Sequence, residues 1–406
     1  MEGKVNHNFQ SLDGGLFSSV TKADVGDGIG KLIQDGYTIM SWADPFFPDP
    51  VLPESVQLEM IKCIQNGDAT HYSMPIGLAE MRQAVAERIQ KTYGVEINPA
   101  RNVLITPGSD SALLYAMMAM INPGDEVLIF DPSYPSNYLN VEMCGGIPIS
   151  VPLYEEEGYT FHAEDIRSRI TKKTKMVVLT HPNNPTATVL RKEKIIELCD
   201  LIIQYDLVLV CDQAFEDHIY DEIEFACPAF QKGMWDRTIT VFSISKGLAL
   251  SGYRVGYIVS NEKIMNVLYG GAVNFLGATN TLSQKSAIVA FQDNSVLKRY
   301  RAIFQKRRDM AYDIFRRIPG VSATKPESGI LIWLNTGRLG SDSEVAAYLL
   351  KHARVSVNEG KFYGPLGGPG HIRIVFSCYA DDEKAFEAYK RIATALEALA
   401  KEKNII

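Results

Sequence analysis

The sequence predicts an α/β protein: a large domain in which helices sandwich a mainly parallel seven-stranded sheet, and a smaller α+β domain. Three observations support this. The chain of 406 residues is too long for one ordinary core. Seven short, β-branched runs between residues 103 and 259 alternate with helical stretches, a pattern typical of parallel sheets buried on both faces. Beyond residue 294 strands and helices segregate instead, as in α+β domains.

The N-terminal region, residues 1–53, is predicted to be an arm that forms part of the small domain. It is rich in Gly, Asp and Pro, and only Thr38 to Ser41 has the pattern of a strand. A helix is predicted from Pro53-Glu54 to Asn66, where Gly67 ends it.

The large domain is predicted to span residues 54–294. Its second helix, 78–93, is expected from apolar residues at helical spacing. The predicted strands are 103–106, 127–130, 147–151, 175–180, 207–212, 238–242 and 255–259, and the helices between them are 109–121, 134–144, 163–170 and 191–205.

The C-terminal small domain is predicted to span residues 295–406. It is expected to contain helices 295–317, 342–352 and 381–401 and strands 329–334 and 371–376. The basic cluster Lys306 to Arg308 is interpreted as part of the solvated face of the first of these helices.

Composition excludes several classes of function. With 41 basic and 48 acidic side chains the net charge is -7, and no dense basic tract indicates a nucleic-acid partner. The six cysteines form no C-x-x-C pair, so neither a metal site nor a disulfide framework is predicted. No stretch approaches the roughly 20 apolar residues of a membrane span, and the first residues have no apolar signal, so a cytoplasmic protein is expected.

The stretch from Ser243 to Arg254 has the strongest chemical signal. Lys246 lies just past the predicted strand 238–242, at the edge where open α/β sheets bind ligands. Two hydroxyls, Ser243 and Ser245, precede it, and Arg254 follows eight residues later. Hydroxyls and a guanidinium can gather on one anion, most simply a phosphate, while the amine faces a carbonyl. A lone lysine at a strand end is more often a solvated surface residue, and this clustering favours a site.

This segment resembles the cofactor-lysine segment of the class I/II aminotransferases, the fold type I enzymes of pyridoxal 5'-phosphate. Further motifs in the family's order extend the resemblance from about Ile39 to Phe376. It implies pyridoxal 5'-phosphate as the cofactor and Lys246 as the residue that holds it covalently.

The turn Gly108-Ser109-Asp110 leads into a predicted helix, whose free N–H groups favour a phosphate, although a plain helix cap is as consistent with it. The resemblance makes this turn, with Arg254, the site of the cofactor phosphate. Asp110 is expected to offer its N–H and to turn its carboxylate away. Because the G-x-G-x-x-G spacing is missing, the turn argues against a nicotinamide dehydrogenase.

Two further strand-end motifs resemble the family's ring-binding loops. Tyr134 in Asp-Pro-Ser-Tyr-Pro matches the aromatic residue that stacks on the pyridine ring, although packing alone would also explain a tyrosine there. Asn184 in His-Pro-Asn-Asn-Pro-Thr matches the asparagine that donates to the cofactor's phenolic oxygen. His181 and Ala187 depart from the family's usual Asn and Gly.

Asp212 ends a buried strand, where a carboxylate needs a positive partner or a proton. A structural ion pair or a helix cap would satisfy it, and the resemblance instead makes Asp212 the partner of the pyridine nitrogen. Phe215 stands where the family usually has tyrosine. Loss of that hydroxyl donor predicts a raised pKa of the linkage between Lys246 and the cofactor.

The substrate is expected to meet Arg373, whose side chain alternates with apolar neighbours on a predicted strand and whose planar guanidinium suits a carboxylate. The resemblance makes Arg373 the arginine for the α-carboxylate, with Asn184 beside it. The substrate's side chain is expected in the arm around Trp42, Ala43 and Asp44, near Tyr72, and in the loops at 270–280. No second arginine is assignable for a dicarboxylate.

Tyr72 resembles the tyrosine that reaches the cofactor phosphate of a neighbouring subunit, which implies a homodimer with shared active sites. The predicted activity is transfer of the amino group of an L-amino acid to a 2-oxo acid by a ping-pong mechanism, with Lys246 and Asp212 as catalytic residues. A carbon–sulfur β-lyase that uses the same cofactor would keep most of these residues. A non-catalytic, ligand-sensing relative beside a DNA-binding domain is disfavoured, because the arm of about 50 residues has no basic helix.

Overall fold

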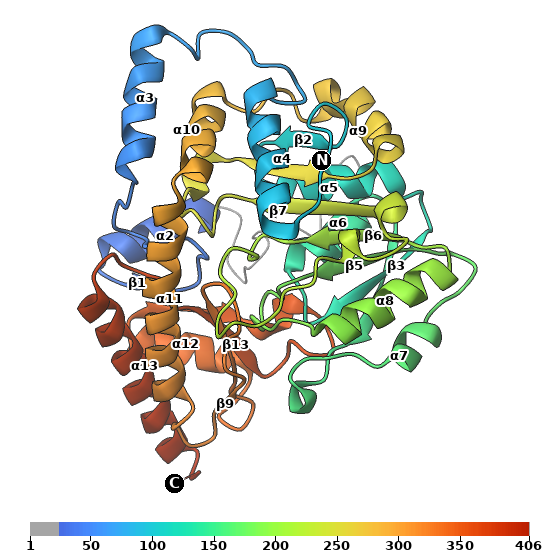
Figure 1. Ribbon diagram of the computed structural model, residues 1–406. Helices are drawn as coiled ribbons and strands as arrows, with labels where there is room; N and C mark the ends of the chain where they lie inside the picture. The colour runs from blue at the N-terminus through green and yellow to red at the C-terminus, as the bar shows by residue number, and fades with distance from the viewer. Residues whose placement is uncertain (1–23, 406) are drawn as a thin grey trace, which may run out of the picture.

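The computed structural model describes residues 24–405, and its centre is a seven-stranded sheet in the order β2-β8-β7-β6-β5-β3-β4 (Figure 1). All neighbouring strands run parallel except β8, which is antiparallel to β2 and to β7. The predicted fold class is thereby confirmed. The strands are β2 (Val103–Thr106), β3 (Glu126–Asp131), β4 (Ile147–Pro152), β5 (Thr174–Thr180), β6 (Val208–Asp212), β7 (Thr238–Ser243) and β8 (Gly256–Val259).

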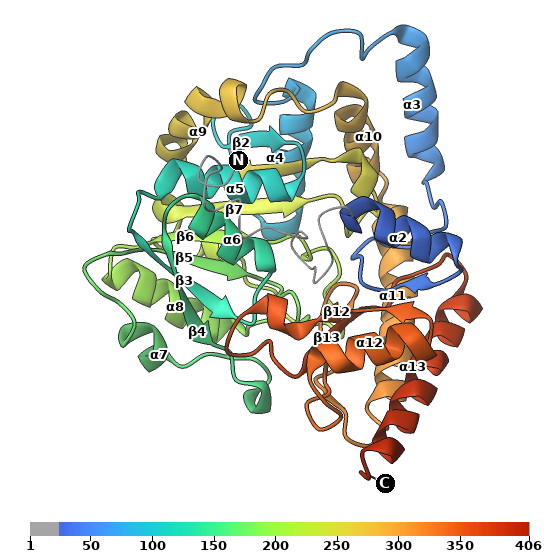
Figure 2. The same ribbon diagram turned by 180° about the vertical axis from the view of Figure 1, so that it is seen from behind.

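Helices cover both faces of this sheet. The two views show α5, α6 and α9 on one face and α4 and α8 on the other (Figures 1 and 2). Side chains of β3 alternate accordingly: Val127 and Ile129 pack in the cluster around α5, whereas Leu128 and Phe130 pack in the cluster around α8. These helices are α4 (Ala79–Tyr93), α5 (Ser109–Met120), α6 (Pro135–Met143), α7 (Ala163–Arg167), α8 (Lys192–Gln204) and α9 (Glu262–Phe275).

The C-terminal part of the chain forms a second, four-stranded antiparallel sheet in the order β12-β13-β10-β9. β1 of the N-terminal arm pairs with β11, so the arm lies against this part as expected. The boundaries after residues 53 and 294 stay a prediction. The elements are β1 (Thr38–Ile39), α10 (Thr281–Gln292), α11 (Asn294–Phe315), β9 (Ser322–Ala323), β10 (Leu331–Asn335), α12 (Asp342–His352), β11 (Val355–Ser356), β12 (Asn358–Glu359), β13 (His371–Val375) and α13 (Asp382–Glu402).

The remaining helices lie outside these sheets or in their loops. They are α2 (Asp24–Gln34), α3 (Glu54–Asn66) and the short 3₁₀ segments Glu155–Glu157, Pro228–Phe230, Trp235–Arg237, Ser251–Tyr253 and Gly360–Tyr363. No helix among residues 24–405 combines the length and apolar character that crossing a membrane requires.

The basic cluster of α11 differs from its prediction. The side chains of Arg307 and Arg308 are fully buried, and only Lys306 is exposed. Arg307 donates to the carbonyl oxygens of residues 378–380, and Arg308 pairs with Asp221. The prediction of a solvated face was wrong for both arginines, because each turns inward to acceptors of the protein: backbone carbonyl oxygens for Arg307, and Asp221 with the Pro326 carbonyl oxygen for Arg308.

The sheet brings the predicted site residues to one edge. β2, β5, β6 and β7 are mutually parallel, so the segments that follow them emerge on the same side. The antiparallel strand β8 begins at that edge, where Gly256 is opposite both Thr106 and Ser243. The loop that carries Lys246 and Arg254 therefore starts and ends beside the same strand ends.

Candidate active site

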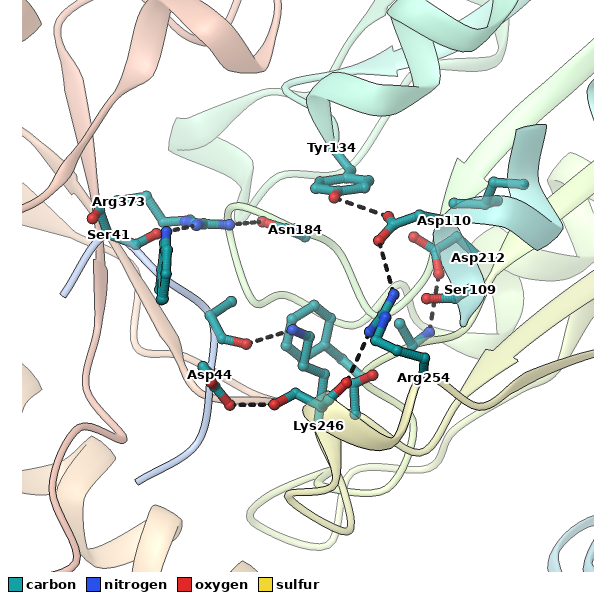
Figure 3. Close-up of a pocket in the computed structure, with 17 residues that line it drawn as sticks. Ser41, Asp44, Ser109, Asp110, Tyr134, Asn184, Asp212, Lys246, Arg254 and Arg373 are labelled. Atoms are coloured by element: carbon teal, nitrogen blue, oxygen red, sulfur yellow. Dashed lines mark hydrogen bonds and ion pairs between the residues drawn. The ribbon is translucent and has the colours of Figure 1, made fainter. Parts of the chain in front are cut away.

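A cavity of about 420 Å³ opens at this edge of the sheet, between the strand ends and the C-terminal part of the chain (Figure 3). Lys246 lies between Arg373 and Asn184 on one side and Asp110, Asp212 and Arg254 on the other. The predicted residues that line the cavity are Trp42, Ala43, Ser109, Asp110, Tyr134, Asn184, Asp212, Phe215, Ser245, Lys246, Arg254 and Arg373.

Lys246 lies in the loop that follows β7, and its Nζ donates a hydrogen bond to the carbonyl oxygen of Ala43. Burial lowers the pKa of this amine to about 8, although the negative charges of Asp110 and Asp44 oppose the shift. A buried amine with this pKa is largely neutral just above pH 8, whereas an ordinary lysine is still protonated there. Its lone pair is therefore available to a carbonyl carbon.

Residues that sequence reasoning did not identify hold the loop of Lys246 in place. A side chain at Gly247 would overlap Asp217, and His218 Nε2 lies 3.1 Å from the Gly247 carbonyl oxygen. Arg88 of α4 pairs with Asp217, and it also lies 3.2 Å from Glu216. The loop after β6 and helix α4 together fix the backbone beside Lys246.

Asp212 at the end of β6 is 4% exposed. Its Oδ1 accepts a hydrogen bond of 3.1 Å from the Ala214 N–H, and among the described residues no cationic side chain forms an ion pair with it. Burial raises its pKa to about 7, although the Ala214 hydrogen bond opposes the shift. A positive charge on a bound ligand would stabilise the ionised form of such a buried carboxyl.

The start of α5 and Arg254 together form a cradle for an anion. Helix α5 begins at Ser109 without a capping side chain, after Gly108 with φ of +90°. A Cβ at Gly108 would overlap the Arg254 guanidinium, which lies over this turn. Arg254 itself has φ of +51°, a conformation that few residues other than glycine adopt.

Asp110 does not turn its carboxylate away from the cavity. Its Oδ2 lies 3.7 Å from Nη2 of Arg254, and its Oδ1 accepts a 3.0 Å hydrogen bond from the Tyr134 hydroxyl (Figure 3). The prediction that the side chain faces away was wrong, because a guanidinium and a phenol attract the carboxylate inward.

Arg373 and Asn184 meet on the opposite wall. Arg373 of β13 is 2% exposed, and it donates to Asn184 Oδ1 at 3.0 Å, to Asn358 Oδ1 at 2.6 Å and to the Ser41 carbonyl oxygen at 3.0 Å. Its guanidinium is thereby fixed in orientation at the cavity wall. Because Asn184 accepts through its side-chain oxygen, its amide nitrogen is the group left for another acceptor.

Three predicted residues do not line the cavity. Gly108 lies under the Arg254 guanidinium, and the Ser243 hydroxyl accepts a 3.1 Å hydrogen bond from the Ser245 N–H. Tyr72 is 98% exposed and borders a different cavity with His71 and Asn280, so a single chain does not bring it to Lys246.

Other parts of the cavity are built by contacts that residue spacing in the sequence does not reveal. Asp44 accepts a 2.5 Å hydrogen bond from the hydroxyl of Ser251, 207 positions away in the chain. Trp42, 44% exposed, packs edge-on against Phe47 with ring centroids 5.3 Å apart. The lining residues that sequence reasoning did not assign are Ser41, Leu113, Ala214 and Ser251.

Comparison with known proteins agrees with this geometry. The family model described as aminotransferase class I and II matches residues 41–392. A probable aspartate/prephenate aminotransferase from Aquifex aeolicus is 29% identical, over 87% of this chain and 90% of the relative. An aspartate aminotransferase from Musicola paradisiaca is 31% identical, over 78% of this chain and 80% of the relative.

Solved structures give the same result. The crystal structure of an aromatic aminotransferase from Pyrococcus horikoshii superimposes with a TM-score of 0.84 and 27% identity, over 93% of this chain and all of that one. Enzymes of this family depend on pyridoxal phosphate in general. The chain belongs to the class I and II aminotransferases.

Proposed function

We propose that the cavity binds pyridoxal 5'-phosphate on Lys246 and transfers the amino group of an L-amino acid to a 2-oxo acid by a ping-pong mechanism. One observation carries the proposal: a buried amine with a pKa of about 8 faces the same cavity as the buried carboxyl of Asp212 and the guanidinium of Arg373. An amine, a partner for a cation and a carboxylate binder are the groups that this reaction requires.

The residues fit this cofactor at both of its ends. Asp212, which lacks a cationic partner among the described side chains, would hold the proton of the pyridine nitrogen. The α5 start and Arg254 would hold the phosphate, and Ser109 and Ser245 line the same cavity. Tyr134 would pack against the ring, and the amide nitrogen of Asn184 would donate to the phenolic oxygen.

Pyridoxal phosphate supplies an electrophilic carbon and a ring that withdraws electrons from the substrate's α-carbon. Arg373 would attract the substrate's carboxylate by its charge, which orients the α-carbon toward Lys246. The neutral amine of Lys246 would take the proton from the substrate's α-carbon, hold it on Nζ and give it up again. Its pKa of about 8 lets Nζ act as both base and acid near neutral pH.

The cavity also bears on the choice of substrate. The cations among its described lining residues are Lys246, Arg254 and Arg373, and each already has a proposed role. A single chain therefore offers no further cation in this cavity for a side-chain carboxylate. Trp42 instead gives the substrate side an aromatic surface.

A homodimer is the second part of the proposal. Tyr72 and Met74 are exposed, and so are Leu58, Ile61 and Ile64, which are three residues apart on α3 and so share one side of that helix. Tyr72 would then reach the cofactor phosphate of the partner subunit.

The decisive experiment uses Lys246→Ala, with Lys263→Ala on the exposed start of α9 as the control. Wild-type protein with pyridoxal phosphate should absorb in the visible range, and borohydride followed by peptide mass analysis should find the cofactor on Lys246. The alanine variant should lose both signals and the activity. A panel of amino donors with 2-oxoglutarate should yield glutamate. Release of pyruvate and a thiol would instead indicate a β-lyase, and a label on another lysine would exclude the proposed role.

A further inference from the structure

Among the described residues that line the cavity, Asp110 is the carboxylate that contacts the proposed phosphate cradle. It is the second residue of α5, so its backbone N–H belongs to the helix start, while its side chain turns back over that start toward Arg254. The Asp110 side chain is 58% exposed, and its carboxylate lies 3.7 Å from the guanidinium of Arg254, whose side chain is 49% exposed. The Tyr134 hydroxyl, at 3.0 Å, holds the carboxylate in this orientation.

The described residues that line the cavity include equal numbers of acidic and basic side chains. Asp44, Asp110 and Asp212 line it together with Lys246, Arg254 and Arg373. Asp44 is bonded to Ser251, and Asp212 accepts from the Ala214 N–H, so Asp110 is the described carboxylate that pairs with Arg254. An anion that binds at the α5 start therefore shares the guanidinium with a negative charge already present.

We propose that Asp110 is an internal counterion of Arg254 that competes with the phosphate group of the cofactor and weakens its binding. The inference rests on the proposed function, because it takes the α5 start as the phosphate site. Its basis is Coulomb repulsion between a carboxylate and a phosphate dianion that face the same guanidinium. The site thus holds its cofactor less tightly than its other groups allow, which favours exchange of the cofactor with solution.

The test measures binding rather than turnover. Dissociation constants of pyridoxal phosphate, inorganic phosphate and pyridoxal are determined for the cofactor-free wild type, Asp110→Asn and Asp110→Ser. Glu80→Gln is the matched control, because Glu80 is an exposed carboxylate in the first turn of α4, another helix. Asn keeps the shape of the side chain, and Ser keeps a short polar group at the helix start.

Both Asp110 variants should bind pyridoxal phosphate and inorganic phosphate roughly tenfold more tightly than the wild type at about 50 mM salt. The ratio should shrink toward one at about 500 mM salt, since screening removes the repulsion. Pyridoxal, which has no phosphate, should change by less than about twofold because no dianion is involved. Glu80→Gln should leave all three constants unchanged.

Equal or weaker phosphate binding by both folded variants would overturn the inference, and so would a tightening that does not depend on salt. If the cofactor labels Lys246 while the Asp110 variants match the wild type, only the inference fails. If neither phosphate nor cofactor binds to any of the proteins, the proposed function fails with it.

Discussion

Asp212 and Lys246 are buried side chains whose pKa values move toward each other. Burial raises that of Asp212 to about 7 and lowers that of Lys246 to about 8. Each pKa shift shows that burial destabilises the charged form of the group. The cost is tolerated because both groups line the proposed cofactor site, where a pyridinium and a carbonyl carbon would relieve it.

Replacing Asp212 by asparagine should therefore act in opposite directions on stability and on catalysis. Removing one partner of a buried ion pair, here Asp212 with the pyridine nitrogen of the proposed cofactor, costs roughly 3–5 kcal/mol. If that cost falls wholly on the transition state, the rate falls by about a hundred- to several-thousand-fold. We expect Asp212→Asn to lower kcat/KM by that factor, measured with the best amino donor. Asp206→Asn, at an exposed position, should leave it unchanged.

The cofactor-free Asp212→Asn chain should be more stable than the wild type. The folded wild type holds the Asp212 proton more tightly, with a pKa of about 7 against 3.8, so its free energy of unfolding falls as pH rises from about 4 to about 7. Because asparagine does not titrate, the variant avoids this pH-dependent fall in the free energy of unfolding, which amounts to roughly 4 kcal/mol at most. Urea unfolding at about pH 5 and pH 8 should show a larger advantage at pH 8. An advantage independent of pH would contradict the assignment.

Phe215 gives a second prediction at the scale of one residue. Its ring lines the cavity and packs against Gly329, where a Cβ would lie 2.6 Å from Cδ1 of Phe215. A tyrosine there would add a donor that stabilises negative charge on the cofactor's phenolic oxygen, so the nitrogen that joins Lys246 to the cofactor should lose its proton at lower pH. A pH titration of the visible band should shift downward in Phe215→Tyr and stay in place in Phe386→Tyr on α13. A band that does not move in either variant refutes the effect.

The elements themselves were predicted to different degrees. The strands of the large sheet were found because fully buried parallel strands are continuous apolar runs that end at Gly, Pro or polar residues. Helix α10 was missed because its buried side chains include Thr281, Gln284 and Ser286, which leave no apolar period to detect. Helices α2 and α9 contain glycines that indicate loops, and α9 occupies the first half of the predicted loop region 270–280.

The site was predicted where one short segment carries the signal, as at Lys246, Asp212 and Asn184. It was missed where the signal is a long-range contact. Asp44 meets Ser251, and Asp217 packs against Gly247, through pairings that the fold creates and that no local spacing encodes. The orientation of Asp110 was mispredicted for the same reason, since Tyr134 and Arg254 come from other loops.

The contact between β8 and α5 yields a prediction for a whole element. A Cβ at Gly256 would lie 2.6 Å from the carbonyl carbon of Gly108 and 2.7 Å from the nitrogen of Ser109. Gly256→Ala should therefore displace the α5 start and weaken pyridoxal phosphate binding at least about tenfold, with the fold retained. Gly252→Ala, in the loop just before β8, is the matched control, because nothing lies within 4 Å of its added atom. Equal dissociation constants, measured with circular dichroism as a check on folding, would contradict this role of Gly256.

At the scale of the whole molecule, Tyr72 tests whether two chains share each active site. If Tyr72 serves the partner, a mixture of Lys246→Ala and Tyr72→Ala subunits forms hybrids with one intact site, which combines Lys246 of one subunit with the partner's Tyr72. Activity should reappear when the two inactive or weakened variants are unfolded together and refolded. The same variants refolded separately and then combined without exchange form the control. No recovery in hybrids of verified composition would place Tyr72 outside the shared site.

The antiparallel strand β8 has a consequence for transplanting this chemistry to another scaffold. Because β8 begins beside the end of β7, the one loop between them carries both the amine of Lys246 and the guanidinium of Arg254. Gly256, the first residue of β8, packs against the start of α5, which completes the cradle. These groups cannot be moved independently. Transfer to another protein would require residues 243–256 as one segment, together with a helix that follows a glycine as α5 does. A lysine placed alone at a strand end would lack the neighbouring site for an anion.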